Sequence, residues 1–238
     1  RKNTIKSLNF FGCGSSILTE DLQKNFEKKF KSTIRNIYGM SEIGVATVDD
    51  TKKYNIYGTI GKPLKGVKIK LINKNNKLIK KENLEGEICV KTPAIFSGYK
   101  GLKKNTCKFT VKNRYFKTGD LAIYQNSNLK FVDRSKDIII KGGVNIAPQE
   151  IDECLQKNGN VYQSATIGVN DEFYGEDIKS FVILKKNKNI RELSLIKYCI
   201  KNLGKMRSPS KIEFVKDLPK TSSGKILKRL LKNWKKKY

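Results

Sequence analysis

The sequence predicts an α/β protein: the end of a large N-terminal α/β domain, a β-rich subdomain, and a complete small α+β C-terminal domain. Three observations predict this organisation. Residues 1–57 follow a strand, helix, strand order, residues 58–135 alternate apolar and polar side chains, and residues 136–238 mix helical and strand periodicity. The 238 residues are enough to bury one large core or two small ones.

The first segment has the pattern that ends an α/β unit. Residues 8–11 form a short apolar run, and residues 34–38 form a second strand-like run. Thr19 is placed to cap a helix between them. The apolar side chains on one face of this helix are Leu22, Phe26 and Phe30. Because the earlier strands of such a unit are missing and the chain opens on Arg1, we expect a piece of a longer polypeptide.

The middle and final segments differ in their periodicity. In the middle segment, Val67, Ile69 and Leu71 alternate with lysines, and Gly86 precedes a strand at residues 87–90. In the final segment we expect strands at 138–140, 164–169, 181–184 and 212–215, and helices at 148–155, 193–203 and 226–234. The boundary between the segments is placed at Lys136.

The charge is strongly positive. Fifty basic and 22 acidic residues give a net charge of +28 and a pI near 9.9, enough to attract a nucleic acid, an acidic membrane face or a phosphate-rich small molecule. The lysines are scattered along all segments, and arginine, the favoured residue for base and phosphate contacts, is scarce. Drift in amino-acid composition therefore explains the positive charge better than a specific nucleic-acid surface does. A non-catalytic polyanion-binding module remains open as an alternative function.

The cysteine and histidine counts limit the chemistry. The five cysteines form no CxxC pair and are odd in number, which is typical of reduced thiols in a cytoplasmic protein. The absence of histidine excludes Ser-His-Asp and Cys-His catalysis and most zinc sites. No apolar run reaches the roughly 20 residues of a transmembrane segment. Chemistry must therefore depend on lysine, arginine, carboxylates, hydroxyls and backbone amides.

A glycine turn with two polar side chains follows the strand at residues 34–38. It contains Gly39, Ser41 and Glu42. In an open α/β sheet, ligands bind at the carboxyl ends of strands. The Ser41 hydroxyl can donate to a phosphate oxygen, and the Glu42 carboxylate can hold Mg²⁺. An ordinary turn at the end of a strand is the alternative.

Three further residues carry side chains suited to a nucleotide. Asp120 can accept both hydroxyls of a ribose, and Arg134 can reach a hydroxyl or phosphate oxygen, although either could equally be a turn residue or a surface ion pair. Lys225 ends a Ser/Thr/Gly loop that could bring a cation to a phosphoryl or carboxylate centre. This loop lacks the first glycine and the spacing of a P-loop, and it could instead be a flexible loop before a basic helix.

Together these segments occur in the order and at the spacing of one family. The chain resembles the adenylate-forming superfamily of acyl-CoA synthetases, peptide-synthetase adenylation enzymes and firefly luciferase, over essentially its whole length. The residues that carry the resemblance are 38–42, 86–87, 118–120, 133–137, 142–145, 148–150 and 219–225.

The resemblance implies a reaction in two steps that uses ATP, Mg²⁺ and coenzyme A. A carboxylic acid is activated to an acyl-adenylate, and the acyl group then passes to the thiol of coenzyme A. The resemblance assigns Ser41 to the α-phosphate, Glu42 to Mg²⁺, and Lys225 to the attacking carboxylate and phosphate oxygens. These three are the implied catalytic residues of an AMP-forming acid-thiol ligase.

The resemblance also implies binding residues and a hinge. The adenine slot is assigned to Gly14, Ser15, Ser16, Asn36, Ile37, Tyr38 and the adjoining Gly39. Ribose contacts are assigned to Asp120 and Arg134, a further nucleotide contact to Asn145, and passage of the pantetheine arm to Gly142 and Gly143. Lys136 is assigned to the hinge of the mobile C-terminal domain.

The resemblance has limits and leaves two acceptors open. The phosphate loop of the family and most of its acyl pocket should lie upstream, so we expect residues 1–238 alone to be inactive in adenylation. The acyl acceptor could be coenzyme A or the phosphopantetheine of a carrier protein, and an amino acid could replace the fatty or other carboxylic acid. A cytoplasmic enzyme without a specific nucleic-acid partner or a transmembrane segment is expected.

Overall fold

The computed structural model describes residues 11–14, 18–49, 57–100, 110–111, 115–222 and 224–234. The chain divides into two compact units, residues 1–132 and 133–238. Strands dominate both units, in parallel and antiparallel pairings, which confirms the predicted α/β class. Within the described residues, no helix has the length and apolar character needed to cross a membrane.

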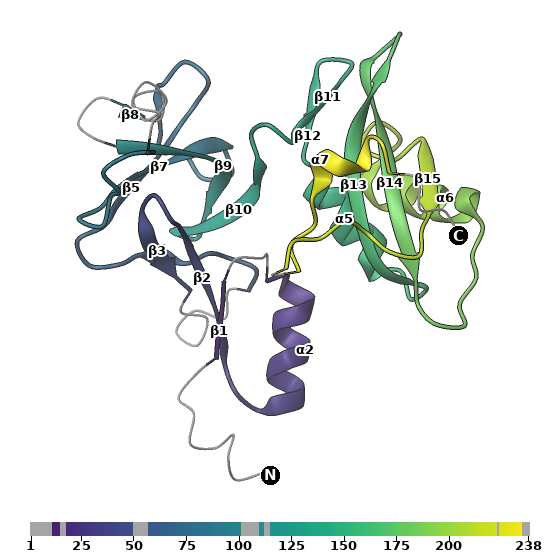
Figure 1. The fold of residues 1–238 in the computed structure, drawn as a ribbon, viewed down its shortest axis with the longest axis horizontal. Coiled ribbons are helices and arrows are strands. Elements are labelled where there is room, and N and C mark those ends of the chain that lie inside the picture. The colour runs from purple at the N-terminus through teal and green to yellow at the C-terminus, as the bar shows by residue number, and fades with distance from the viewer. Residues whose placement is uncertain are drawn as a thin grey trace. The chain divides into compact units, whose positions relative to one another are not determined.

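The first unit begins with a four-stranded sheet in the order β1-β2-β3-β4. Its strands are β1 (Phe11–Cys13), β2 (Ile34–Met40), β3 (Gly44–Val48) and β4 (Lys62–Pro63). β1 and β2 are parallel and are connected through α2 (Glu20–Phe30), which runs beside them (Figure 1). The strand predicted at residues 8–11 lies almost wholly outside the described residues.

Helix α2 is held by a buried polar side chain and by an aromatic contact, in which Phe26 packs edge-on against Phe11 of β1 with ring centroids 5.1 Å apart. Thr19 caps it as predicted, by accepting a hydrogen bond from the amide of Leu22 at 3.4 Å. Its fully buried residue is Gln23, which donates to Asp49 and accepts from the amide of Gly58, whereas Leu22 of the predicted apolar face is 55% exposed. The buried amide of Gln23 and the ring of Phe26 thus together set the rotation of the helix.

A second sheet in this unit has the strand order β10-β9-β7-β5-β6, and β8 pairs with β9. Its strands are β5 (Lys68–Ile72), β6 (Leu78–Ile79), β7 (Gly86–Lys91), β8 (Thr110–Val111), β9 (Tyr115–Gln125) and β10 (Asn128–Arg134). Buried Leu71, Ile88 and Phe116 belong to the same core cluster as Tyr38 and Ile43 of the first sheet. One apolar core therefore fixes the two sheets of this unit against each other.

The second unit has a sheet in the order β12-β11-β14-β13, with β15 parallel to β14. The strands are β11 (Ile139–Lys141), β12 (Val144–Ile146), β13 (Val161–Asp171), β14 (Gly175–Leu184) and β15 (Lys211–Phe214). The helices are α5 (Pro148–Lys157), α6 (Glu192–Leu203) and α7 (Lys228–Leu231). Helix α7 has four residues, whereas the spacing predicted a helix over 226–234, because the amides of Thr221 and Leu227 bond to the carbonyls of Lys225 and Pro219 and close a loop instead of extending the helix.

Side chains on β13 and β14 alternate between two apolar clusters. Ile178 and Val182 pack with Ile151 and Leu155 of α5, whereas Ala165, Ile167 and Phe181 pack with Leu231 of α7. Helices α5 and α7 therefore contact opposite faces of this strand pair, as the period of two in a strand requires.

The described cysteines, Cys13, Cys89, Cys154 and Cys199, are free thiols. Burial raises the pKa of Cys89 and of Cys199 to about 12. Since the thiolate is the reactive form, these two residues act as small apolar side chains of the core.

Candidate functional site

Tyr38 and Asp120, 82 residues apart in sequence, meet inside the first unit. The hydroxyl of Tyr38 donates a hydrogen bond of 2.9 Å to Oδ2 of Asp120, and both residues are buried. The family resemblance assigns Tyr38 to the adenine and Asp120 to the ribose. The fold thus joins two motifs that were each identified separately.

The backbone around Asp120 is held by neighbouring side chains. The hydroxyl of Thr118 accepts from the amide of Asp120 at 3.1 Å and donates to the carbonyl of Ile88. Gly119, with a φ of +74°, donates its amide to Glu87 at 3.2 Å. Because few residues other than glycine adopt this φ, the bend favours glycine at position 119.

The turn that follows β2 carries Ser41 and Glu42. Gly39 makes this turn possible, since a Cβ there would lie 2.3 Å from the carbonyl oxygen of Gly44 on the returning strand. The amide of Ile43 donates to the carbonyl of Met40 at 3.0 Å and closes the turn. Ser41 is exposed and Glu42 is partly exposed, so both are accessible to a ligand.

Tyr99 is a residue of this site that the sequence analysis missed. Its hydroxyl donates to Oε1 of Glu42 at 2.8 Å, and its ring packs edge-on against Phe96 with centroids 4.9 Å apart. Burial and the hydrogen bond to Glu42 raise the pKa of Tyr99, so the hydroxyl remains a donor at neutral pH. The tyrosine stands next to a glycine, but nothing in the sequence alone connects it with Glu42, 57 positions earlier.

Part of the predicted adenine slot lies on adjacent strands. Cys13 of β1 pairs with Asn36 of β2, and a Cβ on Gly14 would lie 3.4 Å from the carbonyl oxygen of Ile37. The side chain of Asn36 is buried and donates to the carbonyl of Thr59 at 3.0 Å, so its amide is engaged within the protein. Ser15 and Ser16 lie outside the described residues.

Lys225 stands in a compact loop of the second unit. The amide of Lys225 donates to the Thr221 hydroxyl at 3.1 Å, and the amide of Thr221 donates to the carbonyl of Lys225 at 2.9 Å. The amide of Leu227 donates to the carbonyl of Pro219, which closes the base of the loop. Lys225 is exposed, so the loop presents its side chain at the surface of the unit.

The predicted glycine turn lies between β11 and β12. Gly142 and Gly143 have φ values of +54° and +81°, and both are exposed, as is Asn145. Lys141 at the end of β11 forms an ion pair of 2.6 Å with Asp177 of β14. Burial by itself would raise the pKa of Asp177, but Lys141 and hydrogen bonds from Ser210 and the Ile178 amide lower it. The ion pair therefore fixes the end of β11, next to the glycine turn, to the neighbouring strand β14.

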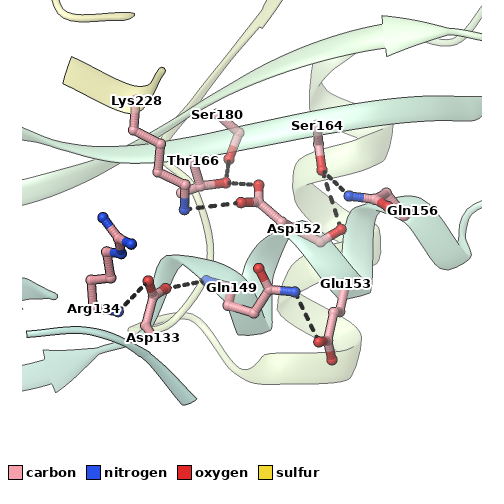
Figure 2. A network of polar contacts seen from close by, with 10 residues as sticks. All are labelled: Asp133, Arg134, Gln149, Asp152, Glu153, Gln156, Ser164, Thr166, Ser180 and Lys228. Atoms are coloured by element: carbon pink, nitrogen blue, oxygen red, sulfur yellow. Dashed lines mark hydrogen bonds and ion pairs between the residues drawn. The ribbon is translucent and has the colours of Figure 1, made fainter. Parts of the chain in front are cut away.

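Asp133 performs a function that the sequence did not reveal. Helix α5 has Ala147 at its N-cap and Pro148 in its first turn, and neither offers a capping side chain. Asp133 supplies the cap, because its Oδ2 accepts from the amide of Gln149 at 2.9 Å while Oδ1 accepts from the amide of Arg134 at 2.7 Å (Figure 2). Burial raises the pKa of Asp133, against the opposing effect of Lys228.

The predicted hinge residue stands in a turn of the second unit. The amide of Asp137 donates to the carbonyl of Arg134 at 2.9 Å, and Lys136 is exposed within this turn. Arg134 is partly exposed and lies directly before it. Asp133, which caps α5, Arg134 and the turn that contains Lys136 are thus consecutive in sequence and belong to one local structure.

The residues near Glu42 fit a magnesium ion that is shared with a phosphate ligand. Mg²⁺ is usually held by one or two carboxylates together with substrate phosphates. Among the described residues, no three histidine, cysteine, aspartate or glutamate side chains gather into a metal-binding group. Glu42 offers one carboxylate whose hydrogen-bond donor, Tyr99, is neutral, beside the exposed hydroxyl of Ser41. One carboxylate and one hydroxyl fit a metal ion that takes its remaining ligands from the phosphates of a bound nucleotide.

Comparison with known families and proteins gives a consistent result. A family model described as AMP-binding enzyme matches residues 1–100, and the model of the AMP-binding enzyme C-terminal domain matches residues 150–225. A long-chain-fatty-acid–CoA ligase of Escherichia coli is 34% identical over 82% of the chain, and one of Bacillus subtilis is 32% identical over 92% of it. The chain spans only 35% and 39% of the lengths of these two relatives.

Solved structures agree with the sequence relatives. The ATP-bound MatB of Rhodopseudomonas palustris superposes with a TM-score of 0.92 at 29% identity, over 98% of this chain and 46% of that one. The O-succinylbenzoate coenzyme A synthetase of Bacillus subtilis in complex with AMP gives 0.83 at 26% identity, over 99% and 50%. Two family models matched in chain order, relatives that are about one third identical over the aligned residues, and a common fold confirm the resemblance: the chain belongs to the adenylate-forming superfamily of AMP-binding enzymes.

Proposed function

We propose that this protein is an AMP-forming acyl-CoA synthetase, which activates a carboxylic acid with ATP and passes the acyl group to coenzyme A. The observation that carries the proposal is the contact between Tyr38 and Asp120. It joins the residue assigned to the base and the residue assigned to the ribose in one buried pair. The names of the relatives, which are CoA ligases, support the same activity.

The first step is attack of the substrate carboxylate on the α-phosphorus of ATP. A bond forms between the carboxylate oxygen and phosphorus, and pyrophosphate leaves. Both reactants are anions, so the Lys225 ammonium lowers their repulsion and stabilises the charge that develops on the phosphate oxygens. The hydroxyl of Ser41 donates to the α-phosphate, and a magnesium ion at Glu42 supplies charge neutralisation when it is bound.

The second step is attack of a thiol on the acyl carbon of the adenylate. A thioester bond forms, the bond between the acyl carbon and the phosphate oxygen breaks, AMP leaves, and the thiol proton passes to solvent. Gly142 and Gly143 are suited to this step, because their exposed turn lets a narrow pantetheine arm pass close to the backbone. We assign the rotation of the C-terminal domain between the two steps to a hinge at Lys136. We assign the second ribose contact, beside that of Asp120, to Arg134.

The experiment that tests the proposal is ATP–pyrophosphate exchange on the full-length gene product, with fatty, aryl, short-chain and amino acids. Exchange that depends on one acid class supports adenylation and names the substrate class. A folded protein that binds no ATP and exchanges with no acid contradicts the proposal.

A second assay separates the acceptors. Coenzyme A and a phosphopantetheine-loaded carrier protein are compared at equal concentration with the acid that supports exchange. Thioester formation on coenzyme A supports the synthetase. Acyl transfer to the carrier protein alone would assign the enzyme to the carrier-loading branch of the superfamily. After cell fractionation, we expect the activity in the cytoplasmic fraction.

A further inference from the structure

Lys228 directly follows the loop that carries Lys225. It is the first residue of α7, three positions after Lys225, and its Nζ lies 3.3 Å from Oδ2 of Asp152 on α5 (Figure 2). The side chain of Lys228 is 21% exposed and that of Asp152 only 6%. The ion pair is therefore largely removed from water, as is the pair of Lys141 and Asp177, and unlike the exposed pair of Lys24 and Glu20.

Asp152 is itself fixed by buried hydroxyls. The Thr166 hydroxyl donates to Oδ1 of Asp152 at 2.7 Å and lies 2.7 Å from the hydroxyl of Ser180. Ser164 donates to the backbone carbonyl of Asp152 at 3.2 Å. All three hydroxyl residues are buried on β13 and β14. Asp152 is consequently held to the sheet on both its carboxylate and its backbone, which makes it a rigid anchor.

The charges around Lys228 are arranged to keep it ionised. Burial disfavours the charged ammonium, but the negative charges of Asp152, Asp133 and Asp137 outweigh burial and raise the pKa of Lys228. A pocket of about 100 Å³ beside Lys228 is lined by further charged residues, namely Lys136, Glu176, Arg229 and Lys232. Lys228 thus faces the acids of both α5 and the segment that contains Arg134 and Lys136.

Helix α7 cannot hold its position without tertiary contacts. Four residues are far too few for a stable isolated helix, so packing must fix it. Leu231 packs on one face of the β13–β14 pair, and Asp152 belongs to the helix on the other face. The ion pair therefore joins elements on opposite faces of the sheet, and only Ile226 and Leu227 separate it from Lys225.

We propose that Lys228 is a positioning residue for Lys225: its ion pair with Asp152 fixes the base of the 219–227 loop and so the place of the catalytic ammonium. The proposal rests on the proposed function for the role of Lys225, but the anchoring itself does not. A buried ion pair contributes little net stability and instead selects one arrangement, because only one register satisfies both charges.

The test uses full-length protein with Lys228→Met, Lys228→Arg and the double variant Lys228→Met/Asp152→Asn. Lys232→Met, one turn further along and exposed, is the matched control. Amide hydrogen exchange of residues 219–227 is the first measurement, and it requires no activity. We expect exchange in this loop to rise about tenfold or more in Lys228→Met and in the double variant, and to stay at the wild-type rate in the control.

The second measurement separates the two half-reactions. In Lys228→Met we expect pyrophosphate exchange to fall about 10- to 100-fold, while thioester formation from supplied acyl-adenylate stays within about threefold. Lys228→Arg should restore most of the exchange activity, because an arginine can still reach the Asp152 carboxylate. Lys232→Met should match the wild type.

The double variant distinguishes positioning from charge compensation. It removes the unpaired buried carboxylate, so it should recover thermal stability while its loop exchange stays high and its adenylation stays low. Recovery of adenylation in the double variant, or unchanged loop exchange in Lys228→Met, would overturn the proposal. An inactive wild type whose loop exchange nonetheless responds as expected would overturn the proposed function and leave the anchoring supported.

Discussion

Two carboxylates of the first unit and two of the second unit have different partners. In the first unit, Asp120 and Glu42 each accept a hydrogen bond from a tyrosine hydroxyl. In the second unit, Asp152 and Asp177 each meet a lysine ammonium at 3.3 and 2.6 Å. A hydroxyl satisfies one lone pair of a carboxylate without neutralising its charge, whereas an ammonium does both.

We propose that this difference separates carboxylates that serve a ligand from carboxylates that serve the fold. A carboxylate held by a neutral donor is oriented and can still attract a cation or accept a ribose hydroxyl. A carboxylate paired with lysine has its charge compensated within the protein. Variants of the first kind should therefore alter ligand binding, and variants of the second kind should alter stability or loop position.

Lys225→Ala should have the largest effect. The lysine is exposed, and we expect adenylation to fall by about 100- to 1,000-fold because the charge on the attacking carboxylate and phosphate is no longer offset. Thioester formation from supplied acyl-adenylate and the thermal midpoint should change little, since exposed residues contribute little stability. Equal loss in both half-reactions would contradict the role assigned to Lys225.

Asp120→Asn should weaken nucleotide binding next most strongly. Loss of the charged acceptor should raise the KM for ATP about tenfold to thirtyfold, with the Tyr38 contact preserved through the remaining carbonyl oxygen. Tyr38→Phe is the control, because it removes only the hydroxyl, and we expect an increase of about threefold. A larger effect in Tyr38→Phe than in Asp120→Asn would mean that the pair orients the ring rather than the ribose.

Tyr99→Phe should weaken binding of the metal rather than of the nucleotide. The ring contact with Phe96 is kept and one hydrogen bond to Glu42 is lost, so the affinity for Mn²⁺ in the presence of ATP should fall up to about tenfold. Electron paramagnetic resonance titration measures this directly, and Tyr115→Phe on β9 serves as a matched control. Unchanged Mn²⁺ affinity would contradict the assignment of Glu42 as a ligand of the metal ion.

Asp177→Asn should have the smallest effect, on stability alone. Because the pKa of Asp177 is lowered by folding, its contribution is present above its ordinary value of 3.8 and disappears as the pH falls through the lowered value. We expect a loss of about 1 kcal/mol near pH 7, which closes to zero once the pH has fallen below the lowered pKa of Asp177. Denaturant unfolding across this range measures it, and Glu20→Gln, in an exposed pair, should show no such gap.

Much of the local structure was predictable from the sequence. The cap at Thr19, the glycine turn at residues 142–143 and most strands of the second unit follow from capping chemistry, positive φ and side-chain alternation. Helix α7 was predicted too long, because the spacing of apolar residues cannot show that residues 219–227 bond to one another. Apolar spacing was correct for Phe26 of α2, which packs on Phe11, but it was wrong for the exposed Leu22 and could not identify Gln23 as a buried residue.

The sequence by itself determined the class of the protein, the order of its motifs and the residue types available for chemistry, since these depend on local patterns and spacing. Tertiary structure alone decided which of them meet. The donation of Tyr99 to Glu42, the cap that Asp133 supplies to α5 and the anchor of Lys228 on Asp152 all join segments distant in sequence. Their physical cause is burial: a polar group removed from water must find a partner, and only the packed fold determines which one is near.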